Sequence, residues 1–213
     1  MIECRSLYKS YKKEPVLQDF NLFVEKGGKV LIKGGSGAGK STLFRIILGI
    51  ELADKGSVLF NGNELSPDTI CNVRRLCAYL DQDVSLPQLS VRGWFEFLFS
   101  FSVNHHLGDK MGDIKNWFDF FGLPLSIMDK DIMDLSGGQR QRIGIVSLLS
   151  LNRDVFILDE PTAFLDKRLK EKTAGLFLSK KDWTVLVISH DEVWHSGITN
   201  AVEIGVVNDS RDR

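Results

Sequence analysis

The sequence predicts an α/β fold with a mainly parallel sheet, an N-terminal antiparallel β subdomain and a helical insert. Two continuous apolar runs, VFILDE (155–160) and TVLVISH (184–190), are typical of strands covered on both faces, as in parallel sheets. Alternating apolar positions in VLQDFNLFV (16–24) indicate a half-buried strand of the N-terminal subdomain. Between Asp83 and Ser136 the chain becomes aromatic-rich without strand alternation, which indicates a helical insert.

The other elements of the N-terminal half follow in order. KVLIKG (29–34) indicates a short buried strand that ends at glycine, and STLFRIILGI (41–50) has apolar residues at helical spacing and closes near Gly49. GSVLFNGNEL (56–65) indicates a hairpin, because it turns at the favourable dipeptide Asn-Gly. RRLCAYLDQ (74–82) predicts one more strand before the insert.

The C-terminal half adds two predictions to the buried strands. A helix is expected from Gln139 to about Leu151, and AVEIGVV (201–207) predicts a last strand before a polar tail. The chain contains no internal repeat and no low-complexity linker.

Composition argues against a nucleic-acid-binding protein and against a disulfide-rich or cysteine-metal protein. Among 213 residues, 27 basic and 28 acidic side chains give a net charge of -1, so no overall field favours nucleic acid as a partner. The three cysteines, Cys4, Cys71 and Cys77, lack the spacing of a disulfide framework or a metal knuckle and are expected to be reduced thiols.

Targeting and membrane signals are also weak. The first residues, MIECRSLYKSYKKEP, lack the apolar centre of a signal peptide, so we expect no export. The apolar stretch 91–103 is interrupted by Arg92 and Glu96 and is shorter than the roughly 20 residues that a membrane span needs. A membrane role would therefore require docking onto another chain.

A phosphate-binding loop is the first chemical signal. GGSGAGKS (34–41) matches GxxxxGK[ST] between a predicted strand and a predicted helix, which indicates the RecA-like core of a P-loop NTPase. The glycines let successive N–H groups converge on phosphate oxygens, Lys40 can reach the β and γ phosphates, and Ser41 can bind Mg²⁺. The predicted nucleotide contacts of this loop are Gly34, Gly35, Ser36, Gly37, Ala38, Gly39, Lys40, Ser41 and Thr42.

Two adjacent carboxylates are expected to bind the metal ion and to activate water. Asp159 lies at the tip of the predicted strand 155–160, where it can hold Mg²⁺, and Glu160 beside it can polarise the attacking water. Such a pair could also be a helix cap or a surface pair, but the neighbouring phosphate loop favours the catalytic interpretation.

At this point the chain resembles the ATP-binding subunits of ABC transporters. The resemblance rests on an ordered set of motifs that spans nearly the whole chain: GGSGAGKST, Gln82 after a strand, LSGGQRQR (135–142), VFILDEPT, FLD (164–166) and His190. It implies a single ABC ATP-binding domain, residues 1–213, with a core and β subdomain over 1–82 and 140–213 and a helical subdomain over about 83–139.

The resemblance also explains the second glycine-rich stretch. In this family two subunits pack head to tail around two ATP molecules, so each signature stretch faces the partner's nucleotide. Ser136, Gly137, Gly138 and Gln139 are therefore expected to contact that nucleotide in trans. The same stretch also has the pattern of a helix entry capped by Ser136, and the two roles are compatible.

Further roles carry over from the family residue by residue. Gln82 resembles the glutamine that contacts Mg²⁺ and nucleotide, although it has acidic neighbours in LDQD. His190 resembles the histidine that holds the γ-phosphate, and Asp166 resembles the aspartate at the subunit interface, where AFLD departs from the commoner SALD. Tyr11 is the expected adenine-stacking aromatic, with Tyr8 as the alternative.

Two functions follow from the resemblance. The first is an ATPase that powers a membrane transporter, with a second ATP-binding subunit (a homodimer) and integral permease subunits as partners, ATP and Mg²⁺ as cofactors, and a cytoplasmic location at the inner face of the membrane. The alternative is an ABC ATPase that transports nothing, such as one for iron-sulfur cluster assembly or cell division. WFDFFGLP (117–124) running into LSGGQRQR also resembles subunits for metal or iron export, although these residues touch no cargo.

Chain length bears on relatives with the same signature. DNA-repair ATPases carry long coiled-coil inserts, translation factors carry two such domains, and some importers carry a C-terminal regulatory domain. At 213 residues, none of these arrangements is expected.

Overall fold

The computed structural model describes residues 1–108 and 110–205 and contains two sheets. Their strands are β1 (Ile2–Tyr11), β2 (Glu14–Val24), β3 (Lys29–Lys33), β4 (Lys55–Phe60), β5 (Asn63–Glu64), β6 (Cys77–Leu80), β7 (Val155–Asp159), β8 (Thr184–Ile188) and β9 (Asn200–Glu203). The α-helices of the described chain are α1 (Lys40–Ile47), α2 (Ile70–Leu76), α3 (Val91–Ser100), α4 (Met111–Phe121), α5 (Gly137–Ser150) and α6 (Lys167–Ser179). Short 3-10 helices cover Ser102–Leu107, Leu125–Ile127, Ile132–Asp134 and Glu192–Trp194.

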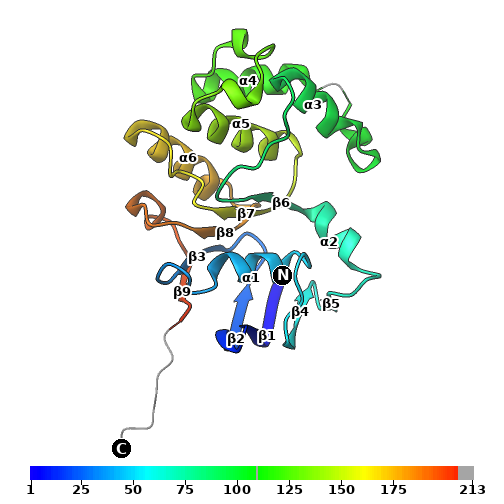
Figure 1. Cartoon of the computed structure of the whole chain (residues 1–213), viewed down its shortest axis with the longest axis vertical. Coiled ribbons are helices and arrows are strands. Elements are labelled where there is room, and N and C mark those ends of the chain that lie inside the picture. The colour runs from blue at the N-terminus through cyan, green and yellow to red at the C-terminus, as the bar shows by residue number, and fades with distance from the viewer. Residues whose placement is uncertain (109, 206–213) are drawn as a thin grey trace, which may run out of the picture.

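The central sheet has five parallel strands in the order β6-β7-β8-β3-β9. A second, antiparallel sheet has the order β2-β1-β4-β5. Figure 1 shows α1 between the two sheets and the helices α3, α4 and α5 gathered beyond the other face of the central sheet. The predicted α/β class, the mainly parallel sheet and the helical insert are confirmed.

Alternate side chains of the central strands pack into two hydrophobic cores, one on each face of the sheet. Val155 and Ile157 of β7 point to the core around α1, whereas Phe156 and Leu158 point to the core beneath α5. The buried run is therefore apolar at every position because both faces of the strand are covered. All five residues of β7 and of β8 are buried.

The hairpin turns as expected, whereas the closing strand is shorter than predicted, because Ile204 and Gly205 of the predicted range 201–207 lie outside β9. Asn61 and Gly62 have φ values of 49° and 81°, and Phe60 pairs with Asn63 across a two-residue turn. The last strand, Asn200–Glu203, pairs with β3, while the predicted positions 206 and 207 lie outside the described residues.

The strand predicted over 74–82 is partly wrong. Arg74 belongs to the helix α2, and the strand covers Cys77–Leu80 alone. The guanidinium of Arg74 donates hydrogen bonds of 3.2 and 2.9 Å to the carbonyls of Leu48 and Gly49, which follow α1, so tertiary contact favours the helix. The strand β1 and the helix α6 were not identified from sequence.

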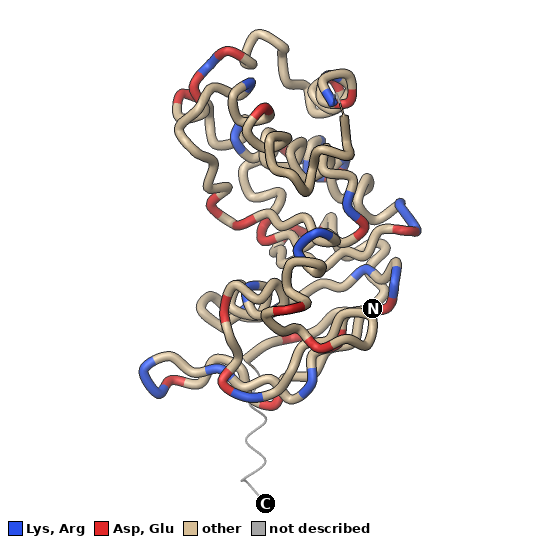
Figure 2. Tube along the Cα trace, turned by 90° about the vertical axis from the view of Figure 1, so that its right-hand side faces the viewer, with Lys and Arg blue, Asp and Glu red and all other residues tan. Residues whose placement is uncertain are grey.

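Charges are mixed over the described chain. Figure 2 shows Lys and Arg interspersed with Asp and Glu in the β-rich part and the helical part alike. Among the described residues, no helix has the length and apolar character that a membrane span requires.

Candidate functional site

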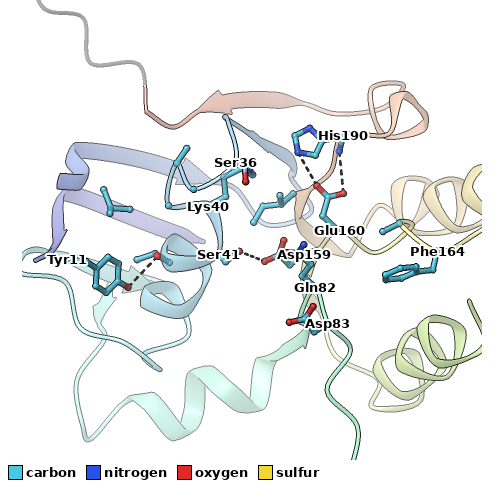
Figure 3. Close-up of a pocket in the computed structure, with 17 residues that line it drawn as sticks. Tyr11, Ser36, Lys40, Ser41, Gln82, Asp83, Asp159, Glu160, Phe164 and His190 are labelled. Atoms are coloured by element: carbon cyan, nitrogen blue, oxygen red, sulfur yellow. Dashed lines mark hydrogen bonds and ion pairs between the residues drawn. The ribbon is translucent and has the colours of Figure 1, made fainter. Parts of the chain in front are cut away.

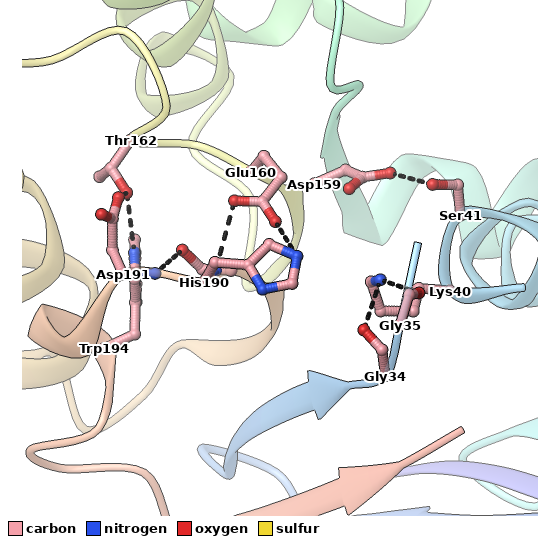
Figure 4. A network of polar contacts seen from close by, with 11 residues as sticks. Gly34, Gly35, Lys40, Ser41, Asp159, Glu160, Thr162, His190, Asp191 and Trp194 are labelled. Atoms are coloured by element: carbon pink, nitrogen blue, oxygen red, sulfur yellow. Dashed lines mark hydrogen bonds and ion pairs between the residues drawn. The ribbon is translucent and has the colours of Figure 1, made fainter. Parts of the chain in front are cut away.

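The phosphate loop lies between β3 and α1, as its sequence predicts. Gly39 has a φ of 93°, and a Cβ at this position would lie 2.1 Å from Cγ1 of Val16, so only glycine fits. The ammonium of Lys40 donates to the carbonyls of Gly34 (2.9 Å) and Gly35 (2.8 Å), which places it inside the curve of the loop (Figure 4).

Ser41 and Asp159 meet across the two motifs. The hydroxyl of Ser41 donates a 2.6 Å hydrogen bond to Oδ2 of Asp159, whose carboxylate is buried at the tip of β7. Burial raises the pKa of Asp159, although the bond from Ser41 opposes that rise. Both side chains offer hard oxygen ligands, so the pair fits Mg²⁺ together with phosphate oxygens.

Glu160 and His190 form a second pair beside the first. Nε2 of His190 lies 3.5 Å from Oε1 of Glu160, and the His190 backbone N–H donates to Oε2 over 3.4 Å. Burial raises the pKa of Glu160, and the nearby His190 acts in the opposite direction. A carboxylate with a raised pKa beside a phosphate loop has the character of a general base.

A partly buried hydrogen-bond network behind this pair was not predicted from the sequence. The hydroxyl of Thr162 donates to Oδ2 of Asp191 (2.6 Å) and accepts from Nε1 of Trp194 (3.2 Å). The other carboxylate oxygen of Asp191 accepts a 2.6 Å bond from Lys170 of α6. The network ties the loop after β7 to the loop that carries His190.

The phosphate loop, the Ser41–Asp159 pair and the Glu160–His190 pair line one cavity of about 470 Å³ (Figure 3). Of the predicted residues, the following line it: Tyr11, Ser36, Gly37, Ala38, Gly39, Lys40, Ser41, Thr42, Gln82, Asp159, Glu160 and His190. The remaining lining residues were not predicted as nucleotide contacts: Val16, Asp83, Ala163, Phe164 and Ile188. Phe164 begins the FLD stretch and Asp83 follows Gln82 directly, so both lie in stretches for which other roles were expected.

Tyr11 lies at one end of the cavity and Phe164 at the other (Figure 3). The Tyr11 hydroxyl donates to Glu51 and lies 3.4 Å from the Thr42 hydroxyl, which ties the ring to α1. Tyr8 is absent from the lining of this cavity. The geometry thus favours Tyr11 as the aromatic wall for a base.

Gln82 lies beside Asp159 at the cavity wall (Figure 3). Its backbone N–H donates a 3.0 Å bond to Asp81, which also accepts from the Tyr79 hydroxyl at 3.1 Å. One of the two acidic neighbours therefore turns toward Tyr79, whereas Asp83 lines the cavity.

The signature stretch is separate from this cavity in the same chain. Ser136 and Gln139 form a reciprocal capping box, with hydrogen bonds of 3.0 and 3.3 Å between side chains and backbone N–H groups. None of the predicted residues Ser136, Gly137, Gly138 and Gln139 lines the cavity. Asp166, expected at an interface, caps α6 by accepting from the Leu169 N–H at 2.9 Å.

Comparisons with known proteins bear on the family of the chain. A family model described as ABC transporter matches residues 17–163. A Fe(3+) ions import ATP-binding protein of Pseudomonas fluorescens is 29% identical over 99% of this chain and 59% of its own length. A spermidine/putrescine import ATP-binding protein of Spiroplasma citri is 30% identical over 98% of this chain and 59% of its own length. The chain thus spans less than two thirds of either relative.

A solved structure shows the same architecture. The ATP-binding cassette MJ0796, in a dimeric post-hydrolysis state bound to ADP and Pi, superposes with a TM-score of 0.80 at 27% identity, and the match covers 96% of both chains. The family match extends over more than half of the chain and includes the phosphate loop, the signature stretch and the carboxylate pair. The chain therefore belongs to the ABC transporter family.

Proposed function

We propose that this chain binds and hydrolyses ATP with Mg²⁺, pairs head to tail with a second copy around two nucleotides, and powers a membrane transporter. One observation carries the proposal: the phosphate loop, the Ser41–Asp159 pair and the Glu160–His190 pair line a single cavity. Membership of the ABC transporter family and the dimeric state of MJ0796 support it.

The residues have distinct roles in the proposed reaction. Tyr11 stacks on the base, the backbone of residues 34–42 and Lys40 hold the phosphates, and Ser41 with Asp159 holds Mg²⁺, which neutralises charge on the phosphates when bound. Gln82 lines the same cavity beside Asp159 (Figure 3).

In the proposed chemistry the oxygen of a water molecule bonds to the γ-phosphorus, and the bond from that phosphorus to the bridging oxygen breaks, which releases ADP and phosphate. Glu160 accepts the proton of the attacking water, and its raised pKa improves its strength as a base. His190 holds the γ-phosphate, and its contact with Glu160 orients both side chains. The partner's Ser136, Gly137, Gly138 and Gln139 close the site, which explains their separation from the cavity of their own chain.

We further propose that residues 1–82 and 140–213 form the ATP-binding core and β subdomain, and that residues 83–139 form the helical subdomain that meets the transporter. Phe97 and Phe101 of this segment are 45% and 46% exposed, with ring centroids 4.9 Å apart. Exposed apolar rings suit contact with an apolar partner helix. We propose a location in the cytoplasm, against integral membrane subunits.

The first test uses Glu160→Gln with wild type as the control. The variant should bind ATP, form an ATP-dependent dimer on size exclusion with light scattering, and release phosphate at less than about a hundredth of the wild-type rate. Turnover at the wild-type rate would refute the proposed base. The absence of an ATP-dependent dimer would refute the head-to-tail arrangement.

The second test identifies the partner. Tagged Glu160→Gln protein, extracted from cells in mild detergent with ATP and Mg²⁺, should co-purify with a multi-span membrane protein at stoichiometric amounts. Recovery of soluble partners alone would favour an ABC ATPase that transports nothing.

A further inference from the structure

Gln141 carries a buried amide to which the proposed reaction assigns no role. It lies in the second turn of α5 and is completely buried. Its Nε2 donates a 3.3 Å hydrogen bond to the backbone carbonyl of Glu160, while its Oε1 has no hydrogen-bond partner among the described residues. A buried unpaired acceptor costs stability, so packing alone does not account for an amide at this position.

The backbone that Gln141 contacts is strained. Glu160 has a φ of 46°, in the left-handed region that disfavours residues with a Cβ. Its N–H donates to the Ile188 carbonyl over 2.9 Å, and its carbonyl accepts from Ala163 over 3.2 Å as well as from Gln141. The bond from Gln141 connects this strained residue to a distant helix.

The same helix also lies against the loop that carries Gln82. A Cβ at Gly144 would lie 2.7 Å from Cγ1 of Val84 and 2.9 Å from Cδ1 of Leu80, so the absence of a side chain allows this close approach. The helix α5 thus touches the segments on both sides of the cavity. Gln141, in the second turn, links this helix to the backbone of Glu160.

We propose that Gln141 is a positioning residue that holds Glu160 in its strained conformation and transmits to it the position of the signature helix. This inference rests on the proposed function, in which the first turn of α5 contacts the partner's ATP while Glu160 acts on its own. Through Gln141, a subunit that engages its partner's nucleotide sets the geometry of its own general base.

The test is Gln141→Leu, with Ser150→Ala as the matched control. Leucine keeps the apolar volume and removes the amide. Ser150 is another buried polar side chain of α5, and among the described residues its hydroxyl bonds to the Val146 carbonyl of the same helix alone, at 2.8 Å. We expect Gln141→Leu to lower kcat at least about fivefold, the equivalent of one lost hydrogen bond. ATP affinity should stay within about twofold, and the thermal midpoint should not fall, because the unpaired acceptor is removed. Ser150→Ala should keep the wild-type kcat.

A double-mutant cycle distinguishes positioning from a general loss of structure. If Gln141 acts through Glu160, adding Gln141→Leu to Glu160→Gln should leave the residual single-turnover rate unchanged. Additive losses would overturn the inference, as would a wild-type kcat in Gln141→Leu while Glu160→Gln is inactive. A wild-type rate in Glu160→Gln would instead overturn the proposed base and this inference together.

Discussion

Thr162→Val and Thr173→Val make the same change in two equally buried places. Both threonines have no exposed surface, and valine replaces the hydroxyl by a methyl group of similar size, so neither change opens a cavity. Thr162 donates to Asp191 at 2.6 Å and accepts from Trp194 at 3.2 Å, whereas the hydroxyl of Thr173 has no partner among the described residues. The pair therefore isolates the contribution of the hydrogen bonds.

The expected magnitudes follow from these contacts. At Thr162 the chain loses a bond to a carboxylate and leaves a buried indole N–H unpaired, which together cost about 2 to 4 kcal/mol of the free energy of unfolding. That loss corresponds to a fall of roughly 5 to 15 °C in Tm for a chain of this size. At Thr173 the change removes an unpaired hydroxyl, so stability should rise by up to about 1 kcal/mol.

Guanidinium unfolding followed by tryptophan fluorescence measures both variants against wild type at fixed protein concentration. Equal losses in the two variants would refute the network, because they would show that the hydroxyl contributes only through its volume. A neutral Thr162→Val would refute it equally. Since Asp191 follows His190 directly, Thr162→Val should also lower kcat, whereas Thr173→Val should leave it unchanged.

Two further predictions concern the cavity. Tyr11→Ala should raise the Kd for ATP about 5- to 150-fold, the loss of one base-stacking contact, while Tyr8→Ala should leave it unchanged in an equilibrium binding assay; the reverse result would move the aromatic wall to Tyr8. Because Glu160 must be ionised to accept a proton and burial raises its pKa, kcat should fall on acidification at a pH above the usual carboxyl range. His190 lowers that pKa, so His190→Ala should move the acid limb of its residual rate to higher pH, and a shift to lower pH would contradict this electrostatic account.

Much of the site could be predicted from sequence because its parts are local. The phosphate loop needs glycines at fixed positions between a strand and a helix, and Asp159 and Glu160 follow directly from a buried strand. The two apolar runs determined the strands β7 and β8, since complete burial on both faces leaves no polar position. The proposed roles of these residues remain predictions.

Only the tertiary structure decided which distant residues meet. The parallel pairing of β7 with β8 brings Glu160 beside His190 and Thr162 beside Asp191, and strand order has no local signature. The same holds for Gln141, whose bond to Glu160 depends on how α5 lies over the sheet.

Side-chain alternation in the sequence could not show which of the two tyrosines, Tyr8 or Tyr11, faces the cavity. The strand β1 changes register between Cys4 and Leu7, between Leu7 and Lys9 and again before Ser10, and each irregularity alters the face to which the next side chains point. Counting alternate positions therefore could not assign Tyr8 or Tyr11 to the cavity. The family resemblance favoured Tyr11 over Tyr8 without identifying the strand β1, and the irregular pairing with β2 decided that Tyr11 lines the cavity.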